Sequence, residues 1–208
     1  NYDAPNPSQN DGSPTTGDNE LTYNMKLIQD SGKFKNQLIY NNFDIERATK
    51  NGSNASVNYF GHRDAINFIG EYNFDLDTRL VYGLDNEFDR AYYKDDWSGL
   101  YEKSDEAVNS QYFDYQFRPY EYLYSTIGFR RDDHTTAGAH NTGRATLAYI
   151  LDGSSKIRSS IGTGLRFPAL YDYHYGTVIK NKEDVNPEKS TSIDLGYETV
   201  FESIDTSL

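Results

Sequence analysis

The sequence predicts an all-β fold: an antiparallel, up-and-down transmembrane β-barrel of which the 208 residues form a part. Two observations carry this prediction. Strand-like segments in which apolar and polar residues alternate follow one another along the chain, separated by turn-forming residues. The connections between these segments alternate between short and long, as they do in bacterial outer-membrane barrels.

The alternation is clearest in residues 67–74, where every second residue is aromatic or glycine. Phe68 and Tyr72 fall on one face of the predicted strand, whereas Asn67 and Glu71 fall on the other. The same pattern recurs in two more segments, 79–92 and 189–201. A strand with one apolar and one polar face separates two different surroundings, which in a barrel are the lipid and the lumen.

We expect nine strands, in chain order at 20–29, 33–46, 57–74, 79–92, 110–117, 120–132, 141–151, 156–166 and 189–201. Short turns are expected at 30–32, 75–77, 118–119, 152–155 and 202–205, and long loops at 1–19, 47–56, 93–109, 133–140 and 167–188. A β-sandwich would mix short and long connections at both ends, because its strands cross over in Greek keys. The regular alternation therefore favours the barrel.

Two regions follow from this division. Residues 1–19 are rich in Asn, Asp, Pro, Ser, Thr and Gly and lack Lys and Arg, so we expect an extracellular loop or a disordered arm. Residues 20–208 are expected to form the barrel domain. The chain begins without Met or a signal peptide and stops where a further strand would start, so we interpret it as a fragment.

Aromatic residues make up 15% of the chain, with 19 Tyr and 11 Phe, whereas hydrophobic residues as a whole reach only 36%. A Tyr ring can be buried while its hydroxyl keeps a polar partner, which suits a surface that is apolar on one side and wet on the other. Membrane interfaces are one such surface. Protein-binding surfaces are another, so composition alone leaves both settings open.

Composition also excludes several classes of protein. The net charge of -12 argues against nucleic-acid binding, which needs clustered Lys and Arg. Cysteine is absent, so the chain has no disulfide, no thiolate metal site and no cysteine nucleophile. No run approaches the roughly 18 apolar residues that a membrane helix needs, which does not argue against spanning by strands.

Four stretches resemble segments typical of TonB-dependent outer-membrane receptors. Residues 160–171 (SIGTGLRFPALY) resemble that family's GxGFRAPxLxELY segment, and residues 186–198 (NPEKSTSIDLGYE) resemble a shortened NPxLxPEKSxxxExGxE segment. Residues 128–134 (GFRRDDH) are similar to the GxRYDDH strand end, and residues 61–68 (GHRDAINF) to the GxRDxxxxxG strand opening. All four occur in the family's order, and together they extend from about residue 57 to residue 201.

This resemblance implies a barrel of about 22 strands that is plugged by an N-terminal domain and energised by the inner-membrane TonB complex. The chain would supply about nine or ten of those strands. Among subfamilies it is most similar to cobalamin-type and siderophore-type receptors. The resemblance therefore implies a segment of a transporter for a scarce, bulky small molecule or metal chelate. The transporter would lie in a Gram-negative outer membrane, among lipid and lipopolysaccharide.

Eight residues carry the resemblance in the two C-terminal motifs: Gly162, Gly164, Arg166, Pro168, Asn186, Pro187, Glu188 and Lys189. The two glycines alternate with larger residues and should face the lumen, where they either relieve a strongly coiled strand or admit a plug or ligand. In the family, the matching Arg and Pro shape the entrance to a long extracellular loop. A structural role is favoured over ligand contact for both pairs.

Aromatic residues of the long loops are the candidates for ligand contact, because large flat ligands bind well to rigid rings. These candidates are Trp97, Tyr101, Tyr171, Tyr173, His174 and Tyr175. The alternative is the aromatic girdle that outer-membrane barrels place at the membrane interface.

Carboxylates at the loops are candidate Ca²⁺ ligands, because Ca²⁺ binds through oxygen atoms and some cobalamin receptors order their loops in this way. The candidates are Asp95, Asp96, Asp132 and Asp133. The alternative is a solvated acidic loop beside lipopolysaccharide.

The four His residues show no metal-ligand spacing, and the sequence contains no Gly-x-Ser-x-Gly elbow. We therefore expect neither a histidine metal site nor an enzyme. Two alternatives to the transporter remain open. One is a passive, porin-like outer-membrane barrel, and the other is a soluble, secreted β-sandwich that binds carbohydrate.

Overall fold

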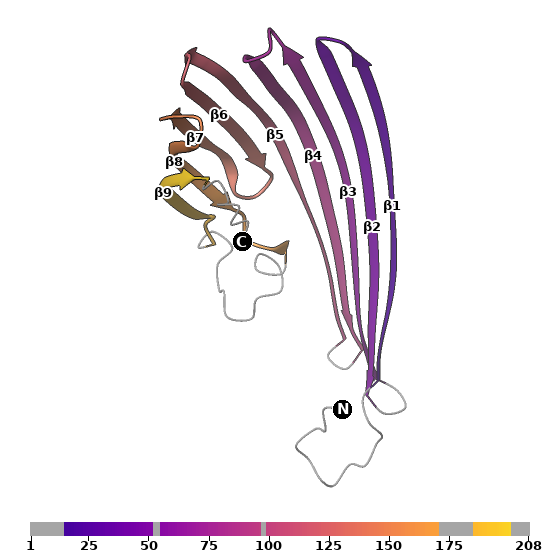
Figure 1. Ribbon diagram of the computed structural model, residues 1–208. Coiled ribbons are helices and arrows are strands. Elements are labelled where there is room, and N and C mark those ends of the chain that lie inside the picture. Colours follow the sequence, from indigo (N-terminus) through magenta and orange to yellow (C-terminus); the bar gives the residue numbers. More distant parts are fainter. Residues whose placement is uncertain (1–14, 52–54, 97–98, 171–184, 201–208) are drawn as a thin grey trace, which may run out of the picture.

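The computed structural model describes residues 15–51, 55–96, 99–170 and 185–200. These residues contain nine strands: β1 (Thr15–Ser31), β2 (Phe34–Asn51), β3 (Ala55–Asn73), β4 (Arg79–Asp95), β5 (Leu100–Tyr120), β6 (Leu123–His134), β7 (Gly138–Ile150), β8 (Ser155–Arg166) and β9 (Glu188–Thr199). Each strand pairs with the next in antiparallel fashion, so the sheet order is the chain order (Figure 1). The predicted up-and-down topology is confirmed.

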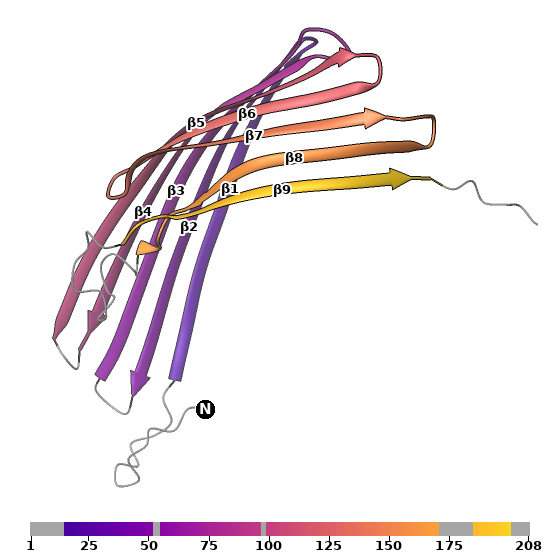
Figure 2. The same ribbon diagram turned by 90° about the vertical axis from the view of Figure 1, so that its left-hand side faces the viewer.

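The sheet is strongly curved and open, with β1 at one edge and β9 at the other (Figures 1 and 2). Strands β1 to β5 are long, up to 21 residues in β5, whereas β6 and β9 have 12 each. At about 3.3 Å per residue, β5 is about 70 Å long, far more than the apolar band of about 25 Å of an outer-membrane barrel. The first five strands therefore form a wall that extends well beyond such a band at one end. We call the end at which β2 and β4 finish the tall end of the wall.

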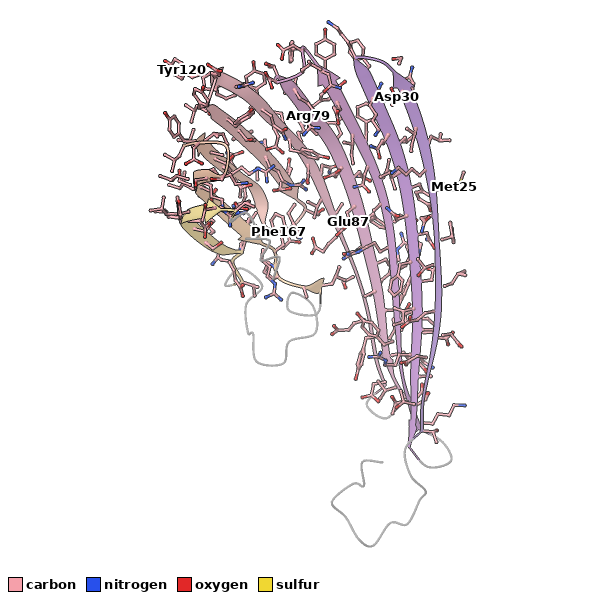
Figure 3. All side chains as sticks on the ribbon, viewed as in Figure 1. Met25, Asp30, Arg79, Glu87, Tyr120 and Phe167 are labelled. Carbon is pink, nitrogen blue, oxygen red and sulfur yellow. The ribbon has the colours of Figure 1, made fainter. Side chains whose placement is uncertain are left out.

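The strand register assigns alternate side chains to the convex and concave faces of the sheet. Met25 projects from the convex side and Glu87 lies on the concave side (Figure 3). A series of large apolar residues shares the convex face and is exposed there: Met25, Leu27, Leu38, Ile66, Leu84, Phe113, Phe129, Ile161, Ile193 and Leu195. Since no second sheet covers them in the described part of the chain, the β-sandwich alternative is wrong.

The convex face changes from apolar to polar part-way along the strands. The change occurs at Asn42, Asp64, Asn86, Gln111 and Arg131, each of which lies on the convex face one alternation beyond an apolar residue. From these positions onward, charged and polar residues alternate with single aromatic rings. At the tall end of the wall, both faces therefore carry polar residues. The apolar band lies toward the opposite end, which carries the turns around Gly32, Asp75 and Asp152.

Three of the predicted long loops are wrong, because the strands continue through them. β2 and β3 leave only residues 52–54 between them, β4 and β5 leave 96–99, and β6 and β7 leave 135–137. Where both faces of a strand are wet, apolar alternation disappears from the sequence, so these strand ends resemble loops. The same reason applies to 15–19, which belong to β1. The connection between β8 and β9 is long, as predicted.

The short turns are held by local hydrogen bonds. Gly32 adopts a φ of 71° in the tight turn between β1 and β2, a conformation that favours glycine. Asp75 Oδ1 accepts a hydrogen bond from the backbone N–H of Asp77 (2.8 Å), and Asp152 Oδ1 accepts one from the N–H of Ser154 (2.8 Å). The turn predicted at 202–205 lies outside the described residues.

The turn predicted at 118–119 lies inside β5. The register between β5 and β6 shifts between Phe117 and Tyr120, and Pro119 in this bulge has no N–H that would need a partner. Arg118 then connects two turns: its Nη1 donates to Asp77 Oδ2 (3.1 Å), and its Nε donates to the carbonyl of Glu121 (2.8 Å).

We expect Asp152→Ala to destabilise the receptor that contains this segment in a pH-dependent way. The backbone N–H of Ser154 holds the pKa of Asp152 below its usual value. The stabilisation is therefore complete above the pKa of the unfolded carboxyl, about 3.9, and is lost as the pH falls through the lower folded pKa. Melting temperatures of wild type and variant should differ at pH 7 and converge only as the pH falls below the lowered pKa of the folded state. Asp30→Ala, which removes a carboxylate without a hydrogen bond, should have the smaller effect.

We also expect the isolated 208-residue chain to aggregate in water and to close poorly in detergent. Every residue of β1 is exposed, and the outer edges of β1 and β9 leave unpaired N–H and C=O groups in the described sheet. Size-exclusion chromatography with light scattering measures this directly. A soluble, monodisperse monomer that melts cooperatively would contradict the expectation.

Candidate functional site on the concave face

A network of charged and polar side chains crosses the middle of the concave face. Arg130 of β6 bridges two carboxylates, donating from Nη1 to Asp85 Oδ2 (2.9 Å) and from Nε to Asp132 Oδ1 (2.8 Å). Asn67 donates to Asp85 Oδ1 (3.0 Å), and the hydroxyl of Ser110 donates to Asp132 Oδ1 (2.6 Å). Four neighbouring strands, β3 to β6, are thereby connected through side chains as well as through the backbone.

A second group of charges lies further toward the tall end. The guanidinium of Arg63 donates to both carboxylate oxygens of Asp89, each at 2.6 Å, and lies 3.3 Å from Glu87 Oε1. Such a two-point contact fixes both side chains, because the guanidinium fork matches the carboxylate. Glu106, which is buried, adds a third carboxylate nearby on the same face. This group therefore contains three carboxylates and one guanidinium, that of Arg63.

The buried imidazole of His134 is the centre of a third group. Its Nδ1 accepts hydrogen bonds from the backbone N–H groups of Thr136 and Ala137, both at 3.1 Å, so Nδ1 carries no proton in this arrangement. Its ring lies 4.5 Å from the ring of Phe167, between centroids. The contact of 3.6 Å between Nδ1 and Glu106 Oε2 is therefore not an ion pair with a charged imidazole.

The second and third groups border one hollow in the concave face. It has a volume of about 650 Å³ and is lined by Phe43, Ile45, Tyr59, Gly61, His62, Arg63, Glu87, Asp89, Arg90, Ala91, Glu106, Val108, His134 and the segment 167–170. Phe167 lies on the concave side (Figure 3), because the chain turns inward after β8. Ligand sites in this size range combine rings with a few polar groups, as this hollow does.

The two C-terminal family motifs lie side by side in the structure. In the register of β8 and β9, Arg166 faces Glu188 and Gly164 faces Ser190. Arg166 Nη1 lies 3.7 Å from Glu188 Oε2, and both side chains are largely exposed. A Cβ on Gly164 would come within 2.6 Å of Ser190 Oγ. This crowding is a structural reason for glycine at that position.

The other motif residues occupy the ends of the same strand pair. Gly162 lies on the concave face between Arg144 and Ser192, while Lys189 lies opposite Leu165. Pro168 belongs to the segment that lines the hollow. Asn186 and Pro187 lead into β9.

Of the six aromatic residues predicted to contact a ligand, the structure places one. Tyr101 lies in β5, opposite Lys94 on the convex face, and its side chain is 63% exposed. It therefore faces away from the hollow, because the predicted loop that carried it is a strand. The other five, Trp97, Tyr171, Tyr173, His174 and Tyr175, lie outside the described residues.

The four carboxylates predicted as Ca²⁺ ligands do not converge. Asp132 and Asp133 point to opposite faces of β6, since they are consecutive strand residues. The β5 partners of Asp95 and Asp132 are Leu100 and Ser110, ten residues or about 33 Å apart along the strand. Hydrogen bonds from Lys94 and Ser56 to Asp96 lower the pKa of that carboxyl. No metal-holding group of three or more His, Asp or Glu occurs among the described residues.

Sequence reasoning missed the concave network and the environment of His134. Arg130 and Asp85 are 45 residues apart in the sequence, so no local motif contains both of them. Only the register of two strand pairs, β4 with β5 and β5 with β6, brings them together, and a one-residue shift would move either one to the opposite face. The alternation of apolar and polar residues in 67–74 and 79–92 does predict that Asp85 lies on the polar face of its strand. It does not predict that Arg130 is its partner.

We expect Arg130→Leu to reduce the unfolding free energy of the receptor by about 2 kcal/mol, since it leaves two carboxylates without their charged donor. Arg144→Leu is the matched control. Arg144 makes a single exposed pair with Asp114 (3.0 Å), so its loss should cost about 1 kcal/mol or less. Denaturant titration followed by tryptophan fluorescence measures both. Equal losses in the two variants would contradict the proposed importance of the bridging position.

Comparison with known proteins places this geometry in a family. The family model described as TonB dependent receptor-like, beta-barrel matches residues 1–208. Among proteins with curated functions, none matches the sequence significantly. No helix among the described residues is long and apolar enough to cross a membrane.

Three solved structures share the fold. The siderophore receptor PirA from Acinetobacter baumannii has a TM-score of 0.74 at 15% identity, over 90% of this chain and 33% of its own. PirA from Pseudomonas aeruginosa has a TM-score of 0.71 at 15% identity, over 91% of this chain and 38% of its own. The copper transporter OprC has a TM-score of 0.66 at 16% identity, over 88% and 36%. This chain spans about a third of their length.

The family's motifs, the antiparallel sheet with an apolar convex face and the match over the whole sequence agree with one another. The chain belongs to the family of TonB-dependent receptor β-barrels.

Proposed function

We propose that this chain is a wall segment of a Gram-negative outer-membrane transporter that takes up a scarce, bulky metal chelate. The observation that carries the proposal is the hollow of about 650 Å³ in the concave face. It lies toward the tall end of the wall, beyond the level at which the convex face becomes polar. A ligand bound there would be held in the lumen outside the hydrocarbon layer.

The orientation follows from the ends of the strands. Such barrels carry their longer loops at the extracellular rim, and the long connection between β8 and β9 lies at the tall end of this sheet. The tightly hydrogen-bonded turns around Asp75 and Asp152 therefore face the periplasm. The hollow beside Arg63 and Phe167 opens toward the outside, where a nutrient arrives.

The lining of the hollow favours a neutral or cationic chelate. Glu87, Asp89 and Glu106 contribute three carboxylates, and Arg63 is already engaged with two of them. An anionic ligand would meet unfavourable potential there, whereas an uncharged chelate can use the aromatic rings. Tyr171, Tyr173, His174 and Tyr175 follow Leu170 directly in the sequence and remain candidate contacts.

Siderophore-type and cobalamin-type ligands both satisfy this requirement when they carry no strong negative charge. We favour the siderophore type, because two of the structures that share the fold are siderophore receptors. Uptake would be energised by the TonB complex through a plug domain. The polar concave network around Arg130 is the surface that a plug would contact.

Phe167→Ala in the complete receptor should weaken chelate binding about tenfold, which corresponds to about 1.4 kcal/mol, because it removes a ring that lines the hollow. Isothermal titration would compare an uncharged iron trihydroxamate, the anionic iron tricatecholate and cobalamin. The trihydroxamate should bind best to the wild type. Glu198→Gln, at the periplasmic end of the concave face, is the control and should bind like the wild type.

Two results would overturn the proposal. Preferential binding of the tricatecholate would contradict the assigned ligand charge. Uptake that persists in cells without TonB would support the passive, porin-like alternative instead.

A further inference from the structure

The ends of two family motifs meet beside the hollow of the concave face. The motif at 128–134 ends at His134, the last residue of β6, and the motif at 160–171 contains Phe167, which follows β8. The centroids of the two rings are 4.5 Å apart, and Phe167 lies on the concave side of the sheet (Figure 3). Both residues line the hollow of about 650 Å³. His134 therefore contacts a ring that forms part of the wall of the proposed ligand site.

His134 also closes the connection between β6 and β7. Only residues 135–137 separate these strands, and Nδ1 of His134 accepts hydrogen bonds from the backbone N–H groups of Thr136 and Ala137, each at 3.1 Å. The hydroxyl of Thr136 donates to Glu106 Oε1 on β5 (2.5 Å). Because an imidazole nitrogen accepts only while it carries no proton, both backbone contacts require an unprotonated Nδ1. One side chain thus closes the turn and contacts Phe167.

A proton on Nδ1 of His134 would replace this acceptor with a donor. The backbone N–H groups of Thr136 and Ala137 would then lose their partner, whereas Glu106 Oε2 lies only 3.6 Å from Nδ1. A hydrogen bond between a charged imidazole and a carboxylate is stronger than one between neutral groups. The protonated ring would therefore turn toward Glu106, which would open the turn and change the contact with Phe167.

The surroundings of His134, which lies at the tall end of the wall outside the apolar band, determine the pH at which this happens. The charged or titratable side chains that face it are Asp89 on β4, Glu106 on β5 and His140 on β7, and the segment 167–170 contributes none. Burial lowers the pKa of His134, although the two carboxylates act in the opposite direction. The closed turn is therefore fully favoured above the ordinary imidazole pKa of about 6.5. It loses stability as the pH falls from that value toward the lower pKa of the closed state.

We propose that His134 is a positioning residue that holds Phe167 in the wall of the hollow while its imidazole is neutral and releases it when the imidazole is protonated. Chelate binding at the hollow is then strongest at neutral pH and weaker in acid. The effect on binding rests on the transport function proposed above. The movement of Phe167 does not, because it depends only on contacts within the chain.

Fluorine NMR measures the movement of Phe167 without any ligand, in the complete receptor purified in detergent with 4-fluorophenylalanine at position 167. We expect its signal to shift in one step below about pH 6.5. His134→Asn should abolish the step, because its amide oxygen still accepts backbone N–H groups but does not titrate. His140→Asn is the matched control and should retain the step, since Nε2 of His140 donates to the carbonyl of Ala137 (3.0 Å) and keeps this proton when the ring is charged. An unchanging signal, or a step that persists in His134→Asn, would overturn the proposal.

Titration with the uncharged iron trihydroxamate at about pH 7.5 and about pH 5, on either side of the imidazole pKa, tests the link with binding. The wild type and His140→Asn should bind more weakly at the lower pH, by up to the roughly tenfold loss expected for Phe167→Ala. His134→Asn should bind equally at both pH values, whatever its affinity. Equal binding by the wild type at both values would overturn the proposal. A fluorine step in a receptor that binds no chelate at either pH would refute the transport function alone and leave the action of His134 on Phe167 in place.

Discussion

The backbone of a strand in lipid must pair all of its N–H and C=O groups with other strands, because hydrocarbon offers no hydrogen-bond partner. The arrangement of this chain follows from that constraint. Each strand is paired with its sequence neighbour, and the outer edges of β1 and β9 require the rest of a barrel. Once pairing is fixed, the period of two sends Met25 and Phe113 to the convex face and Lys26 and Asp114 to the concave face.

The backbone register determines which charged side chains can contact one another across the strands. Arg130 can bridge Asp85 and Asp132 only because two strand pairs, β4 with β5 and β5 with β6, hold a fixed register. The bridge in turn resists a one-residue shift, which would move Arg130 to the face that meets lipid. The burial of Asp132 is tolerated because Ser110 and Arg130 both donate to it. The polar lumen and the apolar exterior therefore reinforce each other.

The sequence was sufficient for the topology and for the strand cores, because lipid on one side imposes an alternation that 67–74 displays openly. It was insufficient for the strand ends. Residues 100–109 continue β5, yet their charges on both faces resemble those of a loop. The Ca²⁺ candidates depended on that loop. The contact between His134 and Phe167 could not be predicted either, since it depends on an inward turn after β8.

The part of the wall that sequence patterns describe least is the part on which the proposed function depends. Below this level the convex face carries apolar residues, as contact with lipid in the proposed membrane location requires. Above it, neither face is so restricted, and each can be shaped for recognition. The concave side there combines Arg63 with carboxylates and aromatic rings that line the hollow. One extended sheet can in this way combine a membrane-facing apolar band with a polar binding surface without any change in its backbone.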